Sequence, residues 1–224
     1  MMRSPRSGVA AGRLAALGLV SVAIIGIASV VAAIPYRGSA GEGYSPLDHY
    51  ISELGEVGQS QLAAWFDIAL IVGGAGLAAF AILLGGRMSG RLRYLFLLFA
   101  VVSGISGTLV GVFPMNDLRV HRVVAGLFFE TGWLMVLVFC IWLARGGSGF
   151  GRWLLIPGAV AVVASLGFIL VYAGADGGSA FAAPTVRPAI SAITVMEWAA
   201  LITLLAWFVA VAIDVGRRRD PATQ

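Results

Sequence analysis

The sequence predicts an all-α membrane protein, a single bundle of six transmembrane helices. Apolar residues make up 59% of the 224 residues and charged residues only 12%, and the mean hydropathy is +0.94. A soluble domain carries about a quarter charged residues, which it needs to cover its surface. The composition therefore excludes a soluble enzyme, a disordered chain and a nucleic-acid-binding protein, and no nucleic-acid partner is expected.

Six apolar runs are each long enough to cross a hydrocarbon core of about 30 Å at 1.5 Å per helical residue. We expect transmembrane helices over the ranges 14–34, 62–85, 92–113, 121–144, 153–173 and 189–213. None of the runs alternates apolar and polar residues as a barrel strand does. Glycine-rich stretches within them favour close helix packing. The whole chain, 1–224, is therefore interpreted as one transmembrane domain.

The first run follows three arginines, as the apolar part of a signal peptide would. Its apolar core of about 21 residues exceeds the 7–15 residues that are typical of such a peptide. We therefore expect the run to remain in the protein as a membrane span.

The arginines predict the orientation of the bundle. All 15 basic residues are arginine, and six spans divide them unequally between the two sides of the membrane. The side that holds both termini has 11: Arg3, Arg6, Arg13, Arg87, Arg91, Arg93, Arg145, Arg152, Arg217, Arg218 and Arg219. The other side has Arg37, Arg119, Arg122 and Arg187. Because positive charge accumulates on the cytoplasmic side, we expect both termini in the cytoplasm and a location in the inner (plasma) membrane of a bacterial cell.

The extracytoplasmic loop 35–61 contains the densest group of reactive side chains. Ser45 followed by proline is typical of a helix start, and Gly55 is typical of a helix end. A short helix between them would place His49 and Glu53 four residues apart on one face.

Two interpretations of His49 and Glu53 stay open. They could be half of a divalent-metal site that His121 or Asp117 completes, since zinc accepts imidazole and carboxylate ligands. They could instead belong to a surface helix whose polar side chains face water and lipid headgroups. The chain has two histidines and no paired metal-binding motif, so we assign no metal ligands.

Three ionisable residues lie within expected spans: Asp67, Glu130 and Glu197. Such residues are costly in a membrane and indicate a functional site. They lie roughly 8–14 Å below the outer boundary at 1.5 Å per residue, so we predict that they line a polar pocket in the outer half of the bilayer. The alternative is structural: each carboxyl is protonated, or is paired with Arg122, Arg119 or a hydroxyl. His121 and Glu130 are nine residues apart, which predicts nearly opposite helix faces.

Two short motifs and one histidine carry a family resemblance. The segment Ile51-Ser52-Glu53-Leu54-Gly55, the turn Gly111-Val112-Phe113-Pro114 and the histidine His121 resemble the bacterial and archaeal six-helix membrane family catalogued as domain of unknown function 998. The resemblance covers nearly the whole chain and implies the fold and the membrane location, but no reaction. A more distant similarity is to the Frag1/DRAM/Sfk1 group, which includes proteins tied to GPI-lipid remodelling.

Together these observations predict a membrane protein whose outer pocket binds or modifies a lipid. For a lipid-modifying enzyme we expect metal-assisted or general acid–base hydrolysis, with His121, Glu53 and Asp117 as catalytic candidates. The ligand-binding candidates are Asp67, Glu130, Glu197, Asp48, His49 and Arg122. The alternatives are a small proton-coupled transporter that uses the buried carboxylates, and a structural or assembly protein. The sequence leaves both the cofactor and catalysis open, and it is compatible with membrane lipids and a homo-oligomer as partners.

Overall fold

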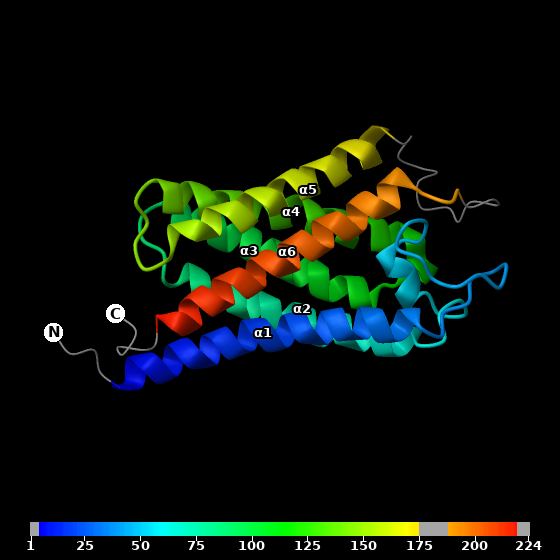
Figure 1. Cartoon of the computed structure of the whole chain (residues 1–224), viewed down its shortest axis with the longest axis horizontal. Coiled ribbons are helices and arrows are strands. Elements are labelled where there is room, and N and C mark those ends of the chain that lie inside the picture. Colours follow the sequence, from blue (N-terminus) through cyan, green and yellow to red (C-terminus); the bar gives the residue numbers. More distant parts are fainter. Residues whose placement is uncertain (1–4, 175–187, 219–224) are drawn as a thin grey trace.

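The structure, a computed structural model, describes residues 5–174 and 188–218 and consists of six long helices that run up and down through one bundle (Figure 1). The helices are α1 (Pro5–Ala33), α2 (Ala63–Gly85), α3 (Leu92–Val112), α4 (Leu118–Ala144), α5 (Leu155–Gly174) and α6 (Ala192–Arg217). Three short 3-10 helices join them: η1 (Ile51–Gly55), η2 (Met115–Asp117) and η3 (Arg152–Leu154). Within the described ranges the only β-type pairing is an isolated bridge between Val57 and Ser60. The all-α prediction is confirmed.

Each of the six helices is long and apolar enough to cross a membrane, and each corresponds to one predicted span. Two helices begin earlier than their apolar runs. Helix α1 starts at Pro5, because alanines before residue 14 continue the helix. Helix α4 starts at Leu118, because the Asp117 side chain accepts the Val120 N–H at 3.3 Å and caps the helix. The chain is thus a multi-pass membrane-type protein.

Helix α1 begins and α6 ends at one end of the bundle, and the loop between α1 and α2 covers the other end (Figure 1). We call the first the arginine-rich end, since the described arginines Arg13, Arg87, Arg91, Arg93, Arg145, Arg152, Arg217 and Arg218 belong to it. We call the second the loop end. That the arginine-rich end faces the cytoplasm remains a prediction from charge. Of the arginines counted for that prediction on either side, Arg3, Arg187 and Arg219 lie outside the described residues.

Each helix packs against the next along the chain, and α6 closes the ring against α1. Glycines permit the closest approach between α2 and α3. A Cβ atom on Gly104 would collide with Ala78 of α2, and one on Gly74 would meet the backbone of Gly107 and Thr108 at 3.2–3.3 Å. The expected role of these glycines in close packing is therefore observed.

The half of the bundle toward the arginine-rich end holds a dense aromatic core. The Phe139 ring lies 5.4 Å from both Trp207 and Phe150, centroid to centroid. This half also contains one buried carboxylate that the sequence analysis did not select. Asp214 accepts the Gly151 N–H at 3.1 Å and the Trp153 indole N–H at 3.0 Å, and it pairs with Arg218 at 2.7 Å. It fastens η3 to the end of α6.

Candidate functional site

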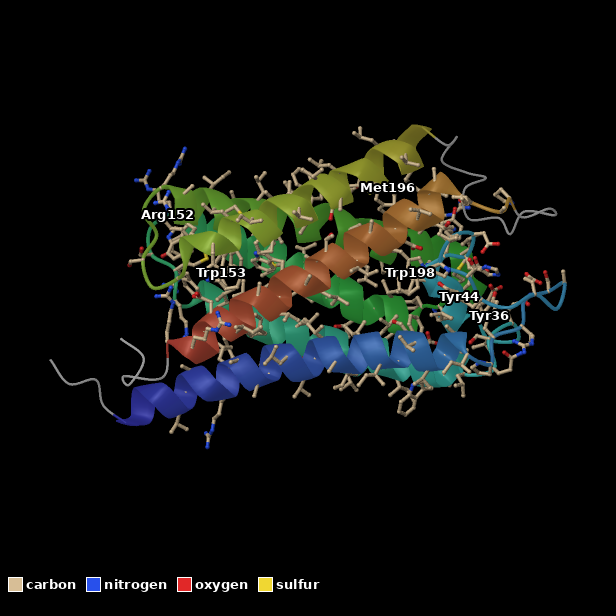
Figure 2. All side chains as sticks on the ribbon, in the orientation of Figure 1. Tyr36, Tyr44, Arg152, Trp153, Met196 and Trp198 are labelled. Carbon is tan, nitrogen blue, oxygen red and sulfur yellow. The ribbon has the colours of Figure 1, made fainter. Side chains whose placement is uncertain are left out.

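The loop between α1 and α2 folds back over the loop end of the bundle and carries a cluster of aromatic rings. Figure 2 shows Tyr36, Tyr44 and Trp198 together at this end, opposite Arg152 and Trp153. The Tyr36 and Tyr44 rings lie 5.3 Å apart, and the Trp198 indole N–H donates to the Tyr44 hydroxyl at 3.0 Å. The loop is therefore packed against α6 rather than extended into solvent.

Two tyrosines of this loop lie in a strongly shielded environment. Burial first, and the Glu197 carboxyl second, raise the pKa of Tyr44 and of Tyr50 well above the usual tyrosine range. The Tyr44 hydroxyl donates to the Tyr50 carbonyl at 3.0 Å. Both phenols are therefore neutral, and they act as hydrogen-bonding and packing groups.

Glu197 of α6 holds the start of η1. Its side chain is 2% exposed, and its Oε2 accepts the Ile51 N–H at 2.9 Å across 146 residues of sequence. One turn earlier on α6, the Thr194 hydroxyl donates to the Leu47 carbonyl at 2.9 Å, and the Ser191 N–H donates to the same carbonyl at 2.7 Å. The loop is thus attached to α6 at two successive points.

Glu53 organises the loop from within. Its Oε1 accepts the Tyr50 N–H at 2.9 Å, and its Oε2 accepts the Tyr36 hydroxyl at 3.1 Å. The expected helix from Ser45 to Gly55 is wrong in its extent. One turn forms, in which the His49 N–H donates to the Ser45 carbonyl, but Tyr50 is extended (φ −66°, ψ 147°) and only Ile51–Gly55 is helical. The chain breaks there because Glu197 and Glu53 take the Ile51 and Tyr50 N–H groups.

His49 is fully buried between the rings of Tyr36 and Tyr44, with ring centroids 5.3 and 5.2 Å away. Its Nδ1 lies 2.7 Å from Asp48 Oδ1, and its Nε2 lies 3.7 Å from Glu42 Oε1. The interpretation as a water-facing surface helix is wrong, because both His49 and Glu53 are buried.

The turn between α3 and α4 provides the second attachment of the loop. Asn116 accepts the Val57 N–H at 2.8 Å and donates to the Val57 carbonyl at 2.9 Å. The Ser52 hydroxyl donates to the Met115 sulfur at 3.1 Å. The loop therefore connects α6 to the α3–α4 turn across the loop end.

Beneath η1 lies a cavity of about 80 Å³ inside the bundle. Side chains of α1, α2, α3, α4 and α6 line it, and most are apolar, among them Phe66, Leu77, Phe128 and Leu204. The residue types change along its length. The side chains that can ionise or donate a strong hydrogen bond lie toward the loop end: Ser52, His121 and Glu197. Ser103 of α3 is the exception. The cavity thus has one polar end and an apolar interior.

The structure separates the three carboxyls that the sequence places in one pocket wall. Glu197 lines the cavity. Glu130 is exposed on the outer face of α4. Asp67 is half-buried and lies against Gly55 of η1, so close that a Cβ atom on Gly55 would collide with the Asp67 carboxyl. The predicted three-carboxyl wall is therefore wrong for Asp67 and Glu130. His121 and Glu130 do point to different sides of α4, as their spacing predicts.

The predicted rim is not assembled around the cavity either. Of its members, His121 lines the cavity and holds the Phe113 carbonyl at 2.8 Å through Nδ1. Asp48, His49 and Glu53 belong to the loop packing described above, and Asp117 is exposed and caps α4. Arg122 is half-buried one residue after His121 and does not line the cavity. Among the residues that the structure describes, no three His, Cys, Asp or Glu side chains come together as metal ligands.

The residues that sequence reasoning missed are those that fold the loop. They are Tyr36, Tyr44, Asn116 and Trp198, together with Ser52 at the cavity. One signal was available: four aromatic residues, Tyr36, Tyr44, His49 and Tyr50, fall within fifteen residues of an otherwise polar loop. Such a density of rings is unusual for a loop that is merely solvated.

A family model described as "Protein of unknown function (DUF998)" matches residues 24–214, from within α1 to the end of α6. No curated protein and no solved structure matches the chain.

Proposed function

The chain belongs to the DUF998 family, and from the geometry of its cavity we propose that it binds one alkyl chain of a lipid inside the helix bundle. The observation that carries the proposal is the combination of a long apolar cavity with polar groups gathered at one end. An amphipathic single-chain lipid has the same division into an apolar tail and a small polar head.

The length of the cavity matches a chain rather than a compact ligand. Its lining residues on α4 extend from His121 to Met135, and those on α2 extend from Phe66 to Ala81. At 1.5 Å per residue these stretches correspond to about 20 Å along the bundle. Pockets for drug-sized ligands hold about 300–1,000 Å³, whereas this cavity holds about 80 Å³. It is long and narrow, so its shape suits a slender chain, and the lining side chains must move apart to admit one.

The polar end favours a neutral head with a hydroxyl group. Ser52, His121 and Glu197 line the cavity there, and their side chains offer both donors and acceptors. No arginine among the described residues lines the cavity, so a carboxylate or phosphate head would be buried there without a cationic partner, which disfavours an anion at this position. We therefore propose a long-chain or isoprenoid alcohol, or a monoacylglycerol, as the class of ligand.

The proposal is binding and not turnover. Glu53 and Asp117, two of the three catalytic candidates, already accept hydrogen bonds from Tyr36, Tyr50 and Val120. A proton-coupled carrier is not favoured, because Glu130 and Asp67 do not line the cavity that Glu197 lines. We further infer that the bundle lies in the plasma membrane with its arginine-rich end inside, which would open the polar end of the cavity toward the outer leaflet.

Photolabelling tests the proposal directly. A long-chain alcohol that carries a diazirine along its tail should label peptides from the cavity-facing sides of α4 and α6. Substituting Ala125→Leu fills the cavity, where Ala125 is 8% exposed, and should reduce this labelling several-fold. The matched control Ala75→Leu adds the same side chain on the exposed face of α2 and should leave it unchanged.

Two outcomes would contradict the proposal. One is labelling confined to lipid-facing residues in the wild type. The other is equal labelling in Ala125→Leu and wild type, provided that both proteins elute as folded particles with similar melting temperatures. Lipid extracted from the purified protein and identified by mass spectrometry would then name the head and the chain.

A further inference from the structure

A second concave surface lies at the arginine-rich end, between α1 and α2, remote from the bundle cavity. This groove has a volume of about 730 Å³. Two arginines, Arg13 of α1 and Arg87 just after α2, line it together with apolar side chains that include Leu14, Leu17 and Leu83. It therefore combines positive charge and apolar surface in one place.

The groove follows from the way in which α1 and α2 pack. Nearer the loop end the two helices touch closely, because a Cβ atom on Gly73 would collide with Ile25 and one on Gly76 would collide with Ser21. Toward the arginine-rich end, Leu14, Leu17 and Leu83 line the groove between the same two helices.

The charge in the groove has no counterpart within the described part of the protein. Arg13 and Arg87 are both exposed, and neither guanidinium group donates a hydrogen bond to, or forms an ion pair with, a described residue. No carboxylate among residues 5–174 and 188–218 lines the groove. Two guanidinium groups that line one groove repel each other. An anion bound between them would attract both groups and offset that repulsion.

The position of the arginines indicates where that anion comes from. Arg13 directly precedes the apolar run that starts at residue 14, and Arg87 lies two residues beyond the end of α2. Both therefore lie at the level of the lipid headgroups, while Leu14, Leu17 and Leu83 continue the groove toward the hydrocarbon. A free phosphate ion would use the arginines but leave the leucine wall exposed.

We propose that this groove is a binding site for an anionic phospholipid. The two guanidinium groups bind the phosphate of the headgroup, for which arginine has a matching bidentate geometry, and an acyl chain lies along the leucines. Basic pockets between transmembrane helices bind anionic headgroups by this chemistry. The site is independent of the proposed alcohol-binding cavity.

The test is titration of the purified full-length protein in detergent with phosphatidylglycerol, followed by native mass spectrometry. Each of Arg13→Gln and Arg87→Gln should weaken binding about fivefold, since one arginine contributes about 1 kcal/mol and 1.4 kcal/mol is tenfold. Additive contributions would weaken the double variant about 25-fold, and because both arginines contact one phosphate, the departure from that factor measures the coupling between them. Arg145→Gln with Arg152→Gln is the matched control, because it removes two charges from the same end outside the groove.

Three results would overturn the proposal. Phosphatidylglycerol could bind the double variant as tightly as the wild type, or the control could lose as much affinity as the double variant. Alternatively, inorganic phosphate alone could raise the melting temperature as much as the lipid and in the same arginine-dependent way, which would indicate an ion site. Phosphatidylcholine, a neutral lipid, should bind all variants equally. Should the double variant fail to fold, the single variants decide the question.

Discussion

Replacing Glu197 tests how the loop end is held together. In Glu197→Met the side chain keeps a similar length but loses the oxygen that accepts the Ile51 N–H. Ile51 is 7% exposed, so its N–H would be left buried without an acceptor. An unsatisfied buried donor costs about 1–3 kcal/mol. The free energy of opening η1 should fall by this amount.

Amide hydrogen exchange measures that opening. With 1.4 kcal/mol for each tenfold change, exchange at Ile51 and its neighbours in η1 should accelerate about 5- to 150-fold. Glu197→Gln keeps an acceptor and should show a smaller change. Glu130→Gln, on the exposed face of α4, should show none. Unchanged exchange in Glu197→Met would refute the claim that Glu197 anchors η1.

Three further predictions concern other parts of the fold. Glu130→Leu should preserve or raise the melting temperature, because it removes an exposed acid from an expected span; a clear loss of stability would indicate a partner at this position. Asp214→Ala should lower stability in thermal unfolding by about 0.5–1.5 kcal/mol for each hydrogen bond lost, since the partly exposed Gly151 and Trp153 N–H groups lose their acceptor. Because the pKa values of Tyr44 and Tyr50 are raised, the stability that these two phenols contribute should be fully present below about pH 10 and be lost above it, where the unfolded chain loses these protons first. Phenolate absorbance that rose at the ordinary tyrosine pH for every tyrosine would contradict this.

The fold was predictable because its signal is local. An apolar run long enough to span a membrane must become a helix, since no water is present to satisfy its backbone groups. Hydropathy therefore locates all six helices without any knowledge of their neighbours. The starts of α1 and α4 differ from the predictions, because alanine propensity and the Asp117 cap act beyond the apolar run.

The candidate site was predictable only in part, because the rotation of each helix in the bundle is not a local property. The carboxyls Glu130 and Glu197 give the same signal in the sequence, an acid within an apolar run. In a soluble protein the polar face of the helix would show which residues point inward. Here both faces are apolar, and Glu130 follows the buried Phe129 by one residue, which turns it about 100° away.

The loop was the least predictable part. Its structure depends on hydrogen bonds between segments far apart in the chain, such as those between Val57 and Asn116 and between Ile51 and Glu197. The residue types allow a capped surface helix equally well. The difference is decided by burial against α6, which the sequence alone does not contain.

The dual position of Glu197 connects the loop to the proposed ligand. Its Oε2 accepts the Ile51 N–H, and the side chain lines the cavity. An alcohol bound in the cavity can donate to Oε1 without displacing Ile51, and it then fixes the carboxyl that holds η1. Ligand binding should therefore slow amide exchange at Ile51, and by linkage any variant that loosens η1 should bind the alcohol more weakly. Faster exchange at Ile51 in the presence of the alcohol would mean instead that ligand and loop compete for the same carboxyl.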